Sequence, residues 1–185
     1  MAFVPADGDA LVVVDVQRDF CPGGSLAVPE GDQVVPVINR LAPAFQTVVT
    51  THDSHPPDHS SFVQHGGPWS EHCVEGTPGW ENHPDLDLDP HHQVFKGRER
   101  ELDGYTGWTP DLAEFLANRG VRRVVVAGLA LDYCVQATAL DARAAGYEVV
   151  VLTDATRAVN VKPDDGERAL DALRAAGVRE DRAES

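Results

Sequence analysis

The sequence predicts an α/β fold in which one doubly wound, mostly parallel sheet has helices on both faces, so that a single domain has three layers. Two observations lead to this prediction. Short apolar runs alternate with segments of helical periodicity along the chain, and the runs lack the polar alternation of a strand with one face in solvent. With 185 residues, of which 42% are hydrophobic, the chain can build one full core, and we assign residues 1–185 to one domain.

The first three predicted elements show this alternation. Ala10–Val14 is a continuous apolar run, typical of a strand that is buried on both faces. The segment 33–45 has helical spacing, with Val34 and Ile38 on one face, and carries a proline near its first turn, where a missing N–H costs little. Thr47–Thr50 is a short second strand that leads directly into a loop rich in histidine.

The later elements continue the pattern. The predicted strands are Gln93–Phe95, Arg122–Ala127 and Tyr147–Leu152, and the predicted helices are Pro110–Asn118, Asp132–Ala145 and Pro163–Ala176. A glycine stands at or just beyond the end of each of these helices, as is usual at a helix C-terminus. The final residues 177–185 contain one apolar residue before a charged run, so a last strand there is expected to be minimal or absent.

Charge and cysteine content exclude several classes of partner. The net charge of −15, spread along the chain, argues against nucleic acid and anionic membranes. The sequence has no apolar run near the length of a membrane span and no signal-peptide pattern at its start, so we expect neither. Cys21, Cys73 and Cys134 form no C-x-x-C pair, which fits a reducing cytoplasm. The oligomeric state stays open between a monomer and a homo-oligomer.

All eight histidines lie between His52 and His92, in a window dense in proline, glycine and aspartate. The segment 53–59 reads D-S-H-P-P-D-H, and His72 follows it. Imidazoles and a carboxylate on one loop are the ligands of a divalent metal site, and a Pro-Pro turn lets ligands two to six residues apart converge on one ion. A single loop histidine is more often a solvated polar residue, but this combination predicts a metal site.

Reactive residues stand at the ends of four predicted strands. Asp15 closes the first strand, Asp53 follows the second, Lys96 follows the third and Cys134 follows the fourth. Ligands of parallel sheets bind beyond the carboxyl ends of the strands, so these side chains are expected to share one site. Each alone has a simpler explanation: a turn residue, a surface lysine or a small buried thiol. Their common placement favours a site.

Cys134 is expected in the first turn of a helix after a tight bend. Free backbone N–H groups and the helix dipole at such a place favour a thiolate and could hold an oxyanion. Asp132 is expected to be the N-cap of this helix rather than a catalytic acid. Cys73 is expected to be structural because it and the adjacent His72 would rarely both point at one ion, and Cys21 is also assigned a structural role.

Six segments carry a resemblance to a known family. They read D-V-Q-R-D-F at 15–20, D-S-H-P-P-D-H at 53–59, W-S-E-H-C-V-E-G-T-P-G at 69–79, F-K-G at 95–97, D-G-Y-T-G-W at 103–108 and G-L-A-L-D-Y-C-V at 128–135. In this order they resemble the nicotinamidase (pyrazinamidase) branch of the isochorismatase-like cysteine hydrolases, over roughly Leu11 to Ala158. The Asp, Lys and Cys are shared by the superfamily, whereas the metal motif and the W-x-x-H-C-x-x-G-T segment narrow the resemblance to this branch.

The resemblance implies a catalytic triad of Asp15, Lys96 and Cys134. Cys134 would attack the carboxamide of nicotinamide to give a thioester and release ammonia, with Asp15 as the general base and acid. Lys96 would favour the thiolate and hold Asp15 ionised. The backbone N–H groups of Ala130 and Cys134 would form the oxyanion hole, and the family's cis peptide maps to Leu129–Ala130. A role in NAD salvage follows from the same resemblance.

The resemblance also implies one divalent ion, expected to be zinc, with iron or manganese as alternatives. Asp53, His55 and His72 would hold it, and its open position would take the pyridine nitrogen. His59 matches a position that is a direct ligand in some relatives and is linked through water in others. The expected substrate-binding residues are Phe20, Trp69, Tyr105, Leu129 and Tyr133. Tyr133 stands where some relatives carry histidine, which could alter the ring pocket.

Two other classes of function remain open at this point. The chain could be a metal-free isochorismatase-like amidase that acts on another small amide, with solvated histidines. It could also be a non-catalytic metal-binding module. A true isochorismatase is disfavoured because a thiol stands at position 134. Metal content separates the first alternative from a nicotinamidase, and ammonia release from nicotinamide separates both hydrolases from the binding module.

Overall fold

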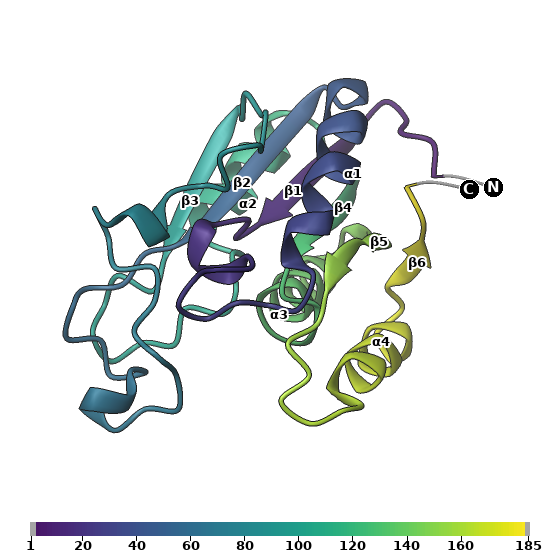
Figure 1. Ribbon diagram of the computed structural model, residues 1–185. Helices are drawn as coiled ribbons and strands as arrows, with labels where there is room; N and C mark the ends of the chain where they lie inside the picture. The colour runs from purple at the N-terminus through teal and green to yellow at the C-terminus, as the bar shows by residue number, and fades with distance from the viewer. Residues whose placement is uncertain (1–2, 184–185) are drawn as a thin grey trace.

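A computed structural model describes residues 3–183 and contains a six-stranded sheet of order β3-β2-β1-β4-β5-β6, in which every neighbouring pair is parallel (Figure 1). The strands are β1 (Asp9–Val14), β2 (Thr47–Asp53), β3 (His92–Lys96), β4 (Arg123–Leu129), β5 (Glu148–Arg157) and β6 (Arg179–Asp181). The α-helices are α1 (Val34–Leu41), α2 (Pro110–Asn118), α3 (Gln136–Ala144) and α4 (Asp165–Ala175). The predicted α/β fold is confirmed.

The helices are divided between the two faces of the sheet. Leu11 and Val13 of β1 pack in one core with α1, whereas Ala10, Val12 and Val14 pack in a second core with α2, α3 and α4. This division follows from the strand order, because right-handed crossovers place the helix on opposite faces when the chain moves along the sheet in opposite directions. The three layers in Figure 1 are the result.

The chain reverses its direction along the sheet between β1 and β4. From β1 it moves outward through β2 to β3, and then α2 returns it to β4 on the other side of β1. The carboxyl ends of β1 and β4 therefore open a crevice, which is where doubly wound sheets bind ligands. Gly128 allows the two ends to approach closely: its φ is +111°, and a Cβ there would lie 2.1 Å from the carbonyl oxygen of Val14.

Several predicted boundaries were wrong. β2 runs to Asp53, so this residue belongs to the strand, and β5 continues beyond Leu152 to Arg157. α1 is shorter than predicted, and single 3-10 turns at 31–33 and 42–44 flank it. The last strand exists but has three residues, as the short apolar content of the C-terminus suggested. None of the helices in the described part of the chain has the length and apolar character to cross a bilayer.

Candidate active site

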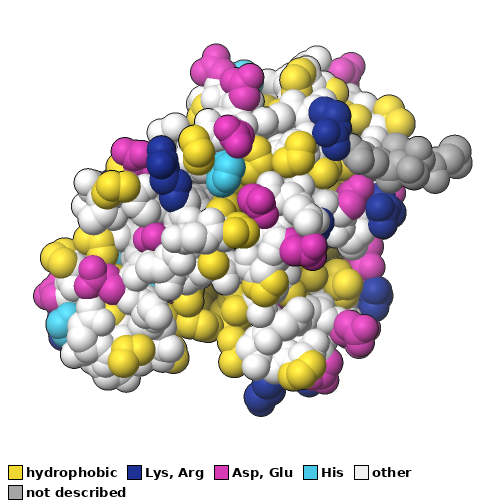
Figure 2. Space-filling model, in the orientation of Figure 1, with side chains coloured by type: hydrophobic (Ala, Val, Ile, Leu, Met, Phe, Trp, Pro, Cys, Tyr) yellow, Lys and Arg dark blue, Asp and Glu magenta, His cyan; other side chains and the backbone are white. Residues whose placement is uncertain are grey.

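A pocket lies at the carboxyl ends of β1 to β4, between the long loop after β2 and the segment after β5. Figure 2 shows this hollow with hydrophobic side chains at its walls. Residues at or beyond the carboxyl ends of the five strands β1 to β5 line it, and they include Phe20, Leu26, Val28, Asp53, His55, His59, Trp69, His72, Asp103, Tyr105, Ala130, Tyr133, Cys134 and Val159. The predicted convergence of the strand ends is therefore present.

Lys96 connects the acidic and thiol groups of the site. Its Nζ lies 2.7 Å from Oδ2 of Asp15, 3.0 Å from Oδ1 of Asp53 and 3.4 Å from Sγ of Cys134. All four residues are buried. Asp15 has a left-handed backbone (φ +46°), and its Oδ1 accepts a 2.6 Å hydrogen bond from the hydroxyl of Thr51. The structure thus brings the three predicted triad residues together.

The surroundings of the Cys134 thiol raise its pKa, contrary to the expectation from its place at a helix start. Burial raises the pKa of Cys134 well above its ordinary value; Lys96 lowers it, and Asp15, Asp53 and a hydrogen bond to Asp15 raise it further. The residue lies in a π-helical turn (Leu131–Val135) that precedes α3. Desolvation and the two carboxylates together outweigh the ammonium of Lys96 here. Asp15, the predicted base, lies within hydrogen-bonding contact of this thiol.

Lys96 is held in its charged form. Burial lowers the pKa of its ammonium, but the carboxylates of Asp15 and Asp53 raise it more, so the resulting pKa is well above the ordinary lysine value. The ammonium also donates to the carbonyl oxygen of Gly104 at 2.5 Å. One cation therefore compensates two buried carboxylates, which is the condition for keeping such charges out of water.

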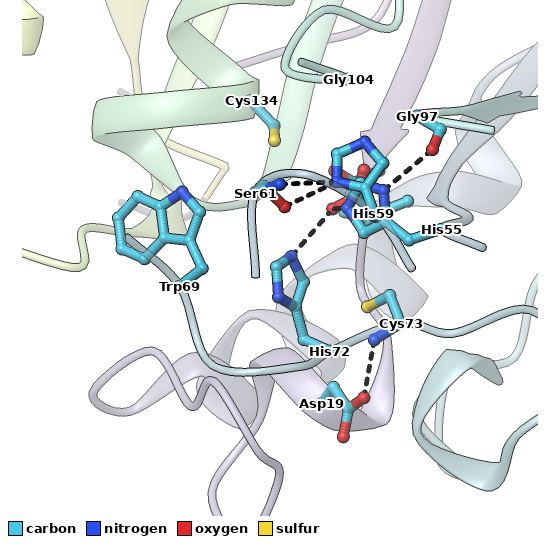
Figure 3. Close-up of polar contacts among 12 residues, drawn as sticks. Asp19, His55, His59, Ser61, Trp69, His72, Cys73, Gly97, Gly104 and Cys134 are labelled. Carbon is cyan, nitrogen blue, oxygen red and sulfur yellow. Dashed lines mark hydrogen bonds and ion pairs between the residues drawn. The ribbon is translucent and has the colours of Figure 1, made fainter. Parts of the chain in front are cut away.

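Asp53, His55 and His72 form a compact group of potential metal ligands. One ligand atom from each lies within 4.8 Å of the others, and all three residues are buried. Oδ2 of Asp53 lies 2.9 Å from Nε2 of His55 and 3.4 Å from Nε2 of His72 (Figure 3). Within the described residues, no other group of this kind is found.

The hydrogen bonds of the two imidazoles fit a metal ion. Nδ1 of His55 donates to the carbonyl oxygen of Gly97 at 2.9 Å, and Nδ1 of His72 donates to that of Ser70 at 2.7 Å. Because Nδ1 donates to a carbonyl, Nε2 is the nitrogen of each ring that can bind a cation, and both Nε2 atoms lie beside Oδ2 of Asp53. Two such nitrogens and a carboxylate oxygen within 4.8 Å of one another are a donor set that fits a divalent ion with N and O ligands.

His59 lies beside this group but is held by other partners. Its ring centre is 4.0 Å from that of His55. However, Nδ1 lies 2.7 Å from the hydroxyl of Ser61, and Nε2 lies 3.1 Å from the carbonyl oxygen of Leu102. Both ring nitrogens thus have protein partners in this arrangement. A direct bond from His59 to a metal would require its ring to leave Leu102.

The predicted ring pocket is assembled, with one exception. Phe20, Trp69, Tyr105 and Tyr133 line the pocket, and Nε1 of Trp69 donates to the hydroxyl of Tyr105 at 3.1 Å. The rings of Trp69 and Tyr133 meet edge to face at 5.1 Å. Leu129, by contrast, does not line the pocket. Its side chain lies on the face of the sheet that α1 covers, where it is fully buried in the core.

The predicted N-cap role of Asp132 was wrong. Its two carboxylate oxygens accept 2.8 Å hydrogen bonds from the backbone N–H groups of Val159 and Asn160, after β5. Ala130 takes the cap position of the π-helical turn, and the peptide bond between Leu129 and Ala130 is cis. Asp132 thus ties the segment that carries the pocket residue Val159 to the turn that carries the thiol.

Six pocket residues were not found by reasoning from the sequence: Leu26, Val28, Ser61, Asp103, Gly104 and Val159. Leu26 and Val28 stand in a glycine- and proline-rich loop without periodicity, and Val159 stands beyond the predicted end of a strand. Cys21 and Cys73, which were expected to be structural, are free and buried, and burial raises the pKa of the Cys21 thiol to about 11.

The fold and the site define a class of doubly wound α/β protein that combines a buried thiol, a carboxylate and an ammonium with an Asp-His-His group. An isochorismatase domain matches residues 9–180, which is most of the chain. The chain belongs to the isochorismatase family.

Known proteins share this architecture over nearly their full length. The nicotinamidase/pyrazinamidase of Mycobacterium tuberculosis is 41% identical over 180 residues, which cover 91% of this chain and 96% of that protein. The structure of the pyrazinamidase of Pyrococcus horikoshii in complex with zinc is 44% identical, with a TM-score of 0.88 over 95% of this chain and 99% of the other. The PnC1 protein of L. infantum, solved with nicotinate, is 37% identical, with a TM-score of 0.93 over 99% and 97%.

Proposed function

We propose that this chain is a metal-dependent nicotinamidase, which hydrolyses nicotinamide, and also pyrazinamide, to the carboxylic acid and ammonia. The observation that carries this proposal is the position of Lys96, whose ammonium joins Asp15 and the thiol of Cys134 to the Asp53 carboxylate of the candidate metal site. The two halves of the site therefore form one buried unit. The names of the relatives, nicotinamidase and pyrazinamidase, support the same substrate class.

In the first half of the proposed reaction, Asp15 takes the proton of the Cys134 thiol as Sγ attacks the carbonyl carbon of the carboxamide. The N–H groups of Ala130 and Cys134 hold the resulting oxyanion. Asp15 then gives the proton to the departing nitrogen, the C–N bond breaks, and ammonia leaves behind a thioester. Lys96 keeps its charge throughout, which stabilises the anionic form of the thiol and of Asp15 in turn.

In the second half, Asp15 takes a proton from water, whose oxygen attacks the thioester carbon. The C–S bond breaks, the carboxylic acid forms, and the proton returns to Sγ of Cys134. The aromatic side chains of Phe20, Trp69 and Tyr133 enclose the pyridine ring and exclude bulk water. This enclosure keeps the carboxamide against the thiol and strengthens the electrostatic effect of Lys96.

Asp53, His55 and His72 would hold the metal ion, and the proposed ion is zinc. When bound, it supplies an open coordination position for the pyridine nitrogen, which orients the carboxamide toward Cys134. His59 is proposed as an outer contact of this group, which becomes a direct ligand only if its ring turns away from Leu102. Lys96 and Asp53 together fix the distance between the ring site and the thiol.

We further propose that the enzyme acts in the cytoplasm, in NAD salvage. Its three cysteines are free and buried, as a reducing compartment allows. The net charge of −15 disfavours nucleic acid and anionic membrane surfaces as partners, so the proposed partner is the small carboxamide alone. Gel filtration with light scattering decides between a monomer and a homo-oligomer.

One assay tests the proposed function. Ammonia release from nicotinamide and pyrazinamide is measured with purified protein of known metal content, before and after chelation and after return of zinc, iron or manganese. We expect turnover that falls on chelation and returns with the native metal. A protein without stoichiometric metal that still releases ammonia would be a metal-free amidase, and a metal-loaded protein without turnover on either amide would contradict the proposal.

A further inference from the structure

The carboxylate of Asp19 holds two segments that are distant in the sequence. This residue lies in a 3-10 turn (Arg18–Phe20) beyond β1. Its Oδ2 accepts a 2.8 Å hydrogen bond from the backbone N–H of Cys73 (Figure 3). Its Oδ1 accepts one of 3.2 Å from the backbone N–H of Ser25. One half-buried side chain thus satisfies a donor in the metal-ligand loop and a donor in the loop at the pocket wall.

The backbone of Cys73 connects Asp19 to two of the candidate metal ligands. It directly follows His72, and its carbonyl oxygen accepts a 3.0 Å hydrogen bond from the N–H of His55. Its φ is +46°, a left-handed conformation that is unfavourable for a residue with a side chain. The hydrogen bond from Asp19 helps to hold this conformation. Asp19 is therefore linked to His55 and His72 through the backbone of Cys73, without contact to either imidazole ring.

Asp19 also supports the pocket wall that is formed by Phe20 and Leu26. Phe20 follows Asp19, and its ring centre lies 5.5 Å from that of His72. The backbone N–H of Leu26 donates to the carbonyl oxygen of Asp19 at 3.0 Å, one residue beyond the Ser25 contact. Phe20 and Leu26 both line the pocket. The ring wall and the ligand His72 thus share one support.

We propose that Asp19 is a positioning residue that sets the metal ligand His72 and the ring wall of Phe20 and Leu26 together. The inference rests on the proposed metal site. Asp19 takes no part in proton transfer, and its effect passes through the backbone of Cys73 and through the loop at Ser25. Its loss should therefore weaken zinc binding and substrate binding in parallel, and should affect the chemical step less.

The principal variant is Asp19→Asn, which is nearly isosteric and keeps one acceptor oxygen but sets an NH2 group against the other donor. We expect the zinc dissociation constant, measured by competition with a chelating dye, to rise roughly tenfold, in the range seen for outer-shell partners of metal ligands. KM for nicotinamide should rise severalfold at saturating zinc, with a smaller change in kcat. The thermal unfolding midpoint of the metal-free protein reports whether the variant is folded.

A second variant displaces the carboxylate and keeps its charge. A Cβ at Gly79 would lie 2.2 Å from Oδ2 of Asp19, so Gly79→Ala should reproduce the loss of zinc affinity. The matched control is Glu81→Gln, which removes an exposed ion pair with Arg18 on the same turn and leaves both Asp19 contacts intact. We expect this control to bind zinc as the wild type does.

The outcomes separate the inference from the proposed function. If the wild type binds no stoichiometric zinc, the proposed metal site fails, and the inference fails with it. If the wild type binds zinc and either folded variant, Asp19→Asn or Gly79→Ala, keeps its affinity within about twofold, the inference alone is overturned. An equal loss in Glu81→Gln would also overturn it, because the effect would then belong to the whole loop.

Discussion

Nζ of Lys96 lies 3.0 Å from Oδ1 of Asp53, while the other oxygen of the same carboxylate faces the two imidazoles. Asp53 thus belongs to the candidate metal site and to the charge pair of the thiol site at once. The second carboxylate contact of Lys96 is with Asp15 at 2.7 Å. A substitution of Asp53 should therefore affect both the metal site and the thiol site, whereas a substitution of His72 should affect the metal site alone.

Substitution of Asp53 by asparagine tests this double role. We expect Asp53→Asn to lose zinc and also to lower kcat, because Lys96 loses one of its two carboxylate partners. His72→Ala should lose zinc too, but its deficit should lie mainly in KM, since the triad is untouched. Steady-state kinetics with metal analysis decides the matter, and identical kcat values for the two variants would contradict the shared role of Asp53.

Cys134→Ala should abolish ammonia release while the fold is retained, because the nucleophilic atom is lost and the change in volume is small. Cys21→Ala is the matched control: it also removes a buried thiol, and its activity should stay within about twofold of wild type. The assay is ammonia release from nicotinamide. Activity of Cys134→Ala within about tenfold of wild type would eliminate this residue as the nucleophile.

The general base is tested by a double-mutant cycle. Asp15→Asn keeps the shape of the side chain but cannot take the thiol proton, so acylation should slow by about 10²–10⁴-fold. Lys96→Ala should also lose activity, and the double variant should lose much less than the product of the two single losses, because the three groups act as a unit. Fully multiplicative losses in single-turnover measurements would show that the residues act independently.

The histidines of the long loop should separate into three groups. His72→Ala should reproduce the effect of a chelator, with a raised KM, and His59→Ala should have an intermediate effect. His83→Ala should leave activity unchanged, because its Nδ1 only accepts a hydrogen bond from the nearby N–H of Asp85. Zinc content and KM are the measurements, and a His83→Ala variant that lost zinc would disprove this assignment of the ligands.

Two further histidines, His91 and His92, are not the solvated loop residues that single loop histidines usually are. Nδ1 of His91 accepts a 3.1 Å hydrogen bond from the N–H of Val48, and His92 belongs to β3 and stacks on Phe115 at 4.5 Å. Alanine at either position should lower the thermal unfolding midpoint by the equivalent of about 1 kcal/mol, without a change in KM. Thermal denaturation beside steady-state kinetics tests both.

Asp132→Ala should loosen the pocket wall. Its two 2.8 Å hydrogen bonds hold Val159 and Asn160, and their loss releases the segment after β5 from the turn that carries the thiol. We expect KM for nicotinamide to rise severalfold and the free energy of unfolding to fall by about 1–3 kcal/mol. Kinetics and denaturant unfolding measure the two effects, and an unchanged KM would mean that Val159 does not bound the substrate.

Much of the fold could be predicted because it depends on patterns local to each segment. The run Ala10–Val14 is apolar at every position, and only a strand covered on both faces requires that. The extension of β5 to Arg157 could not be read in this way, because Thr153 and Asp154 are only half-buried and interrupt the apolar run. Pairing with β4, which carries an irregularity in register after Val126, keeps the strand extended there.

The candidate site was predictable where residue types suit one chemistry, as for Cys134 and the loop histidines. The supporting contacts were not, because they depend on distance in space. Asp19 and Cys73 are separated by 54 positions, and nothing in the sequence around either indicates the other. The raised pKa of the thiol was missed for a similar reason: it depends on burial, which a helix-start pattern does not report.

The place of β1 in the middle of the sheet has a consequence for synthesis of the protein. Asp15 leaves the ribosome early, whereas β4 and Cys134 follow only after most of the chain has been made, and the two strands must pair before base and thiol meet. Such long-range pairing is slow relative to local helix formation. A nascent or truncated chain that lacks β4 therefore exposes the apolar edge of β1 and has no assembled nucleophile. The thiol site is therefore complete only after β1 and β4 have paired.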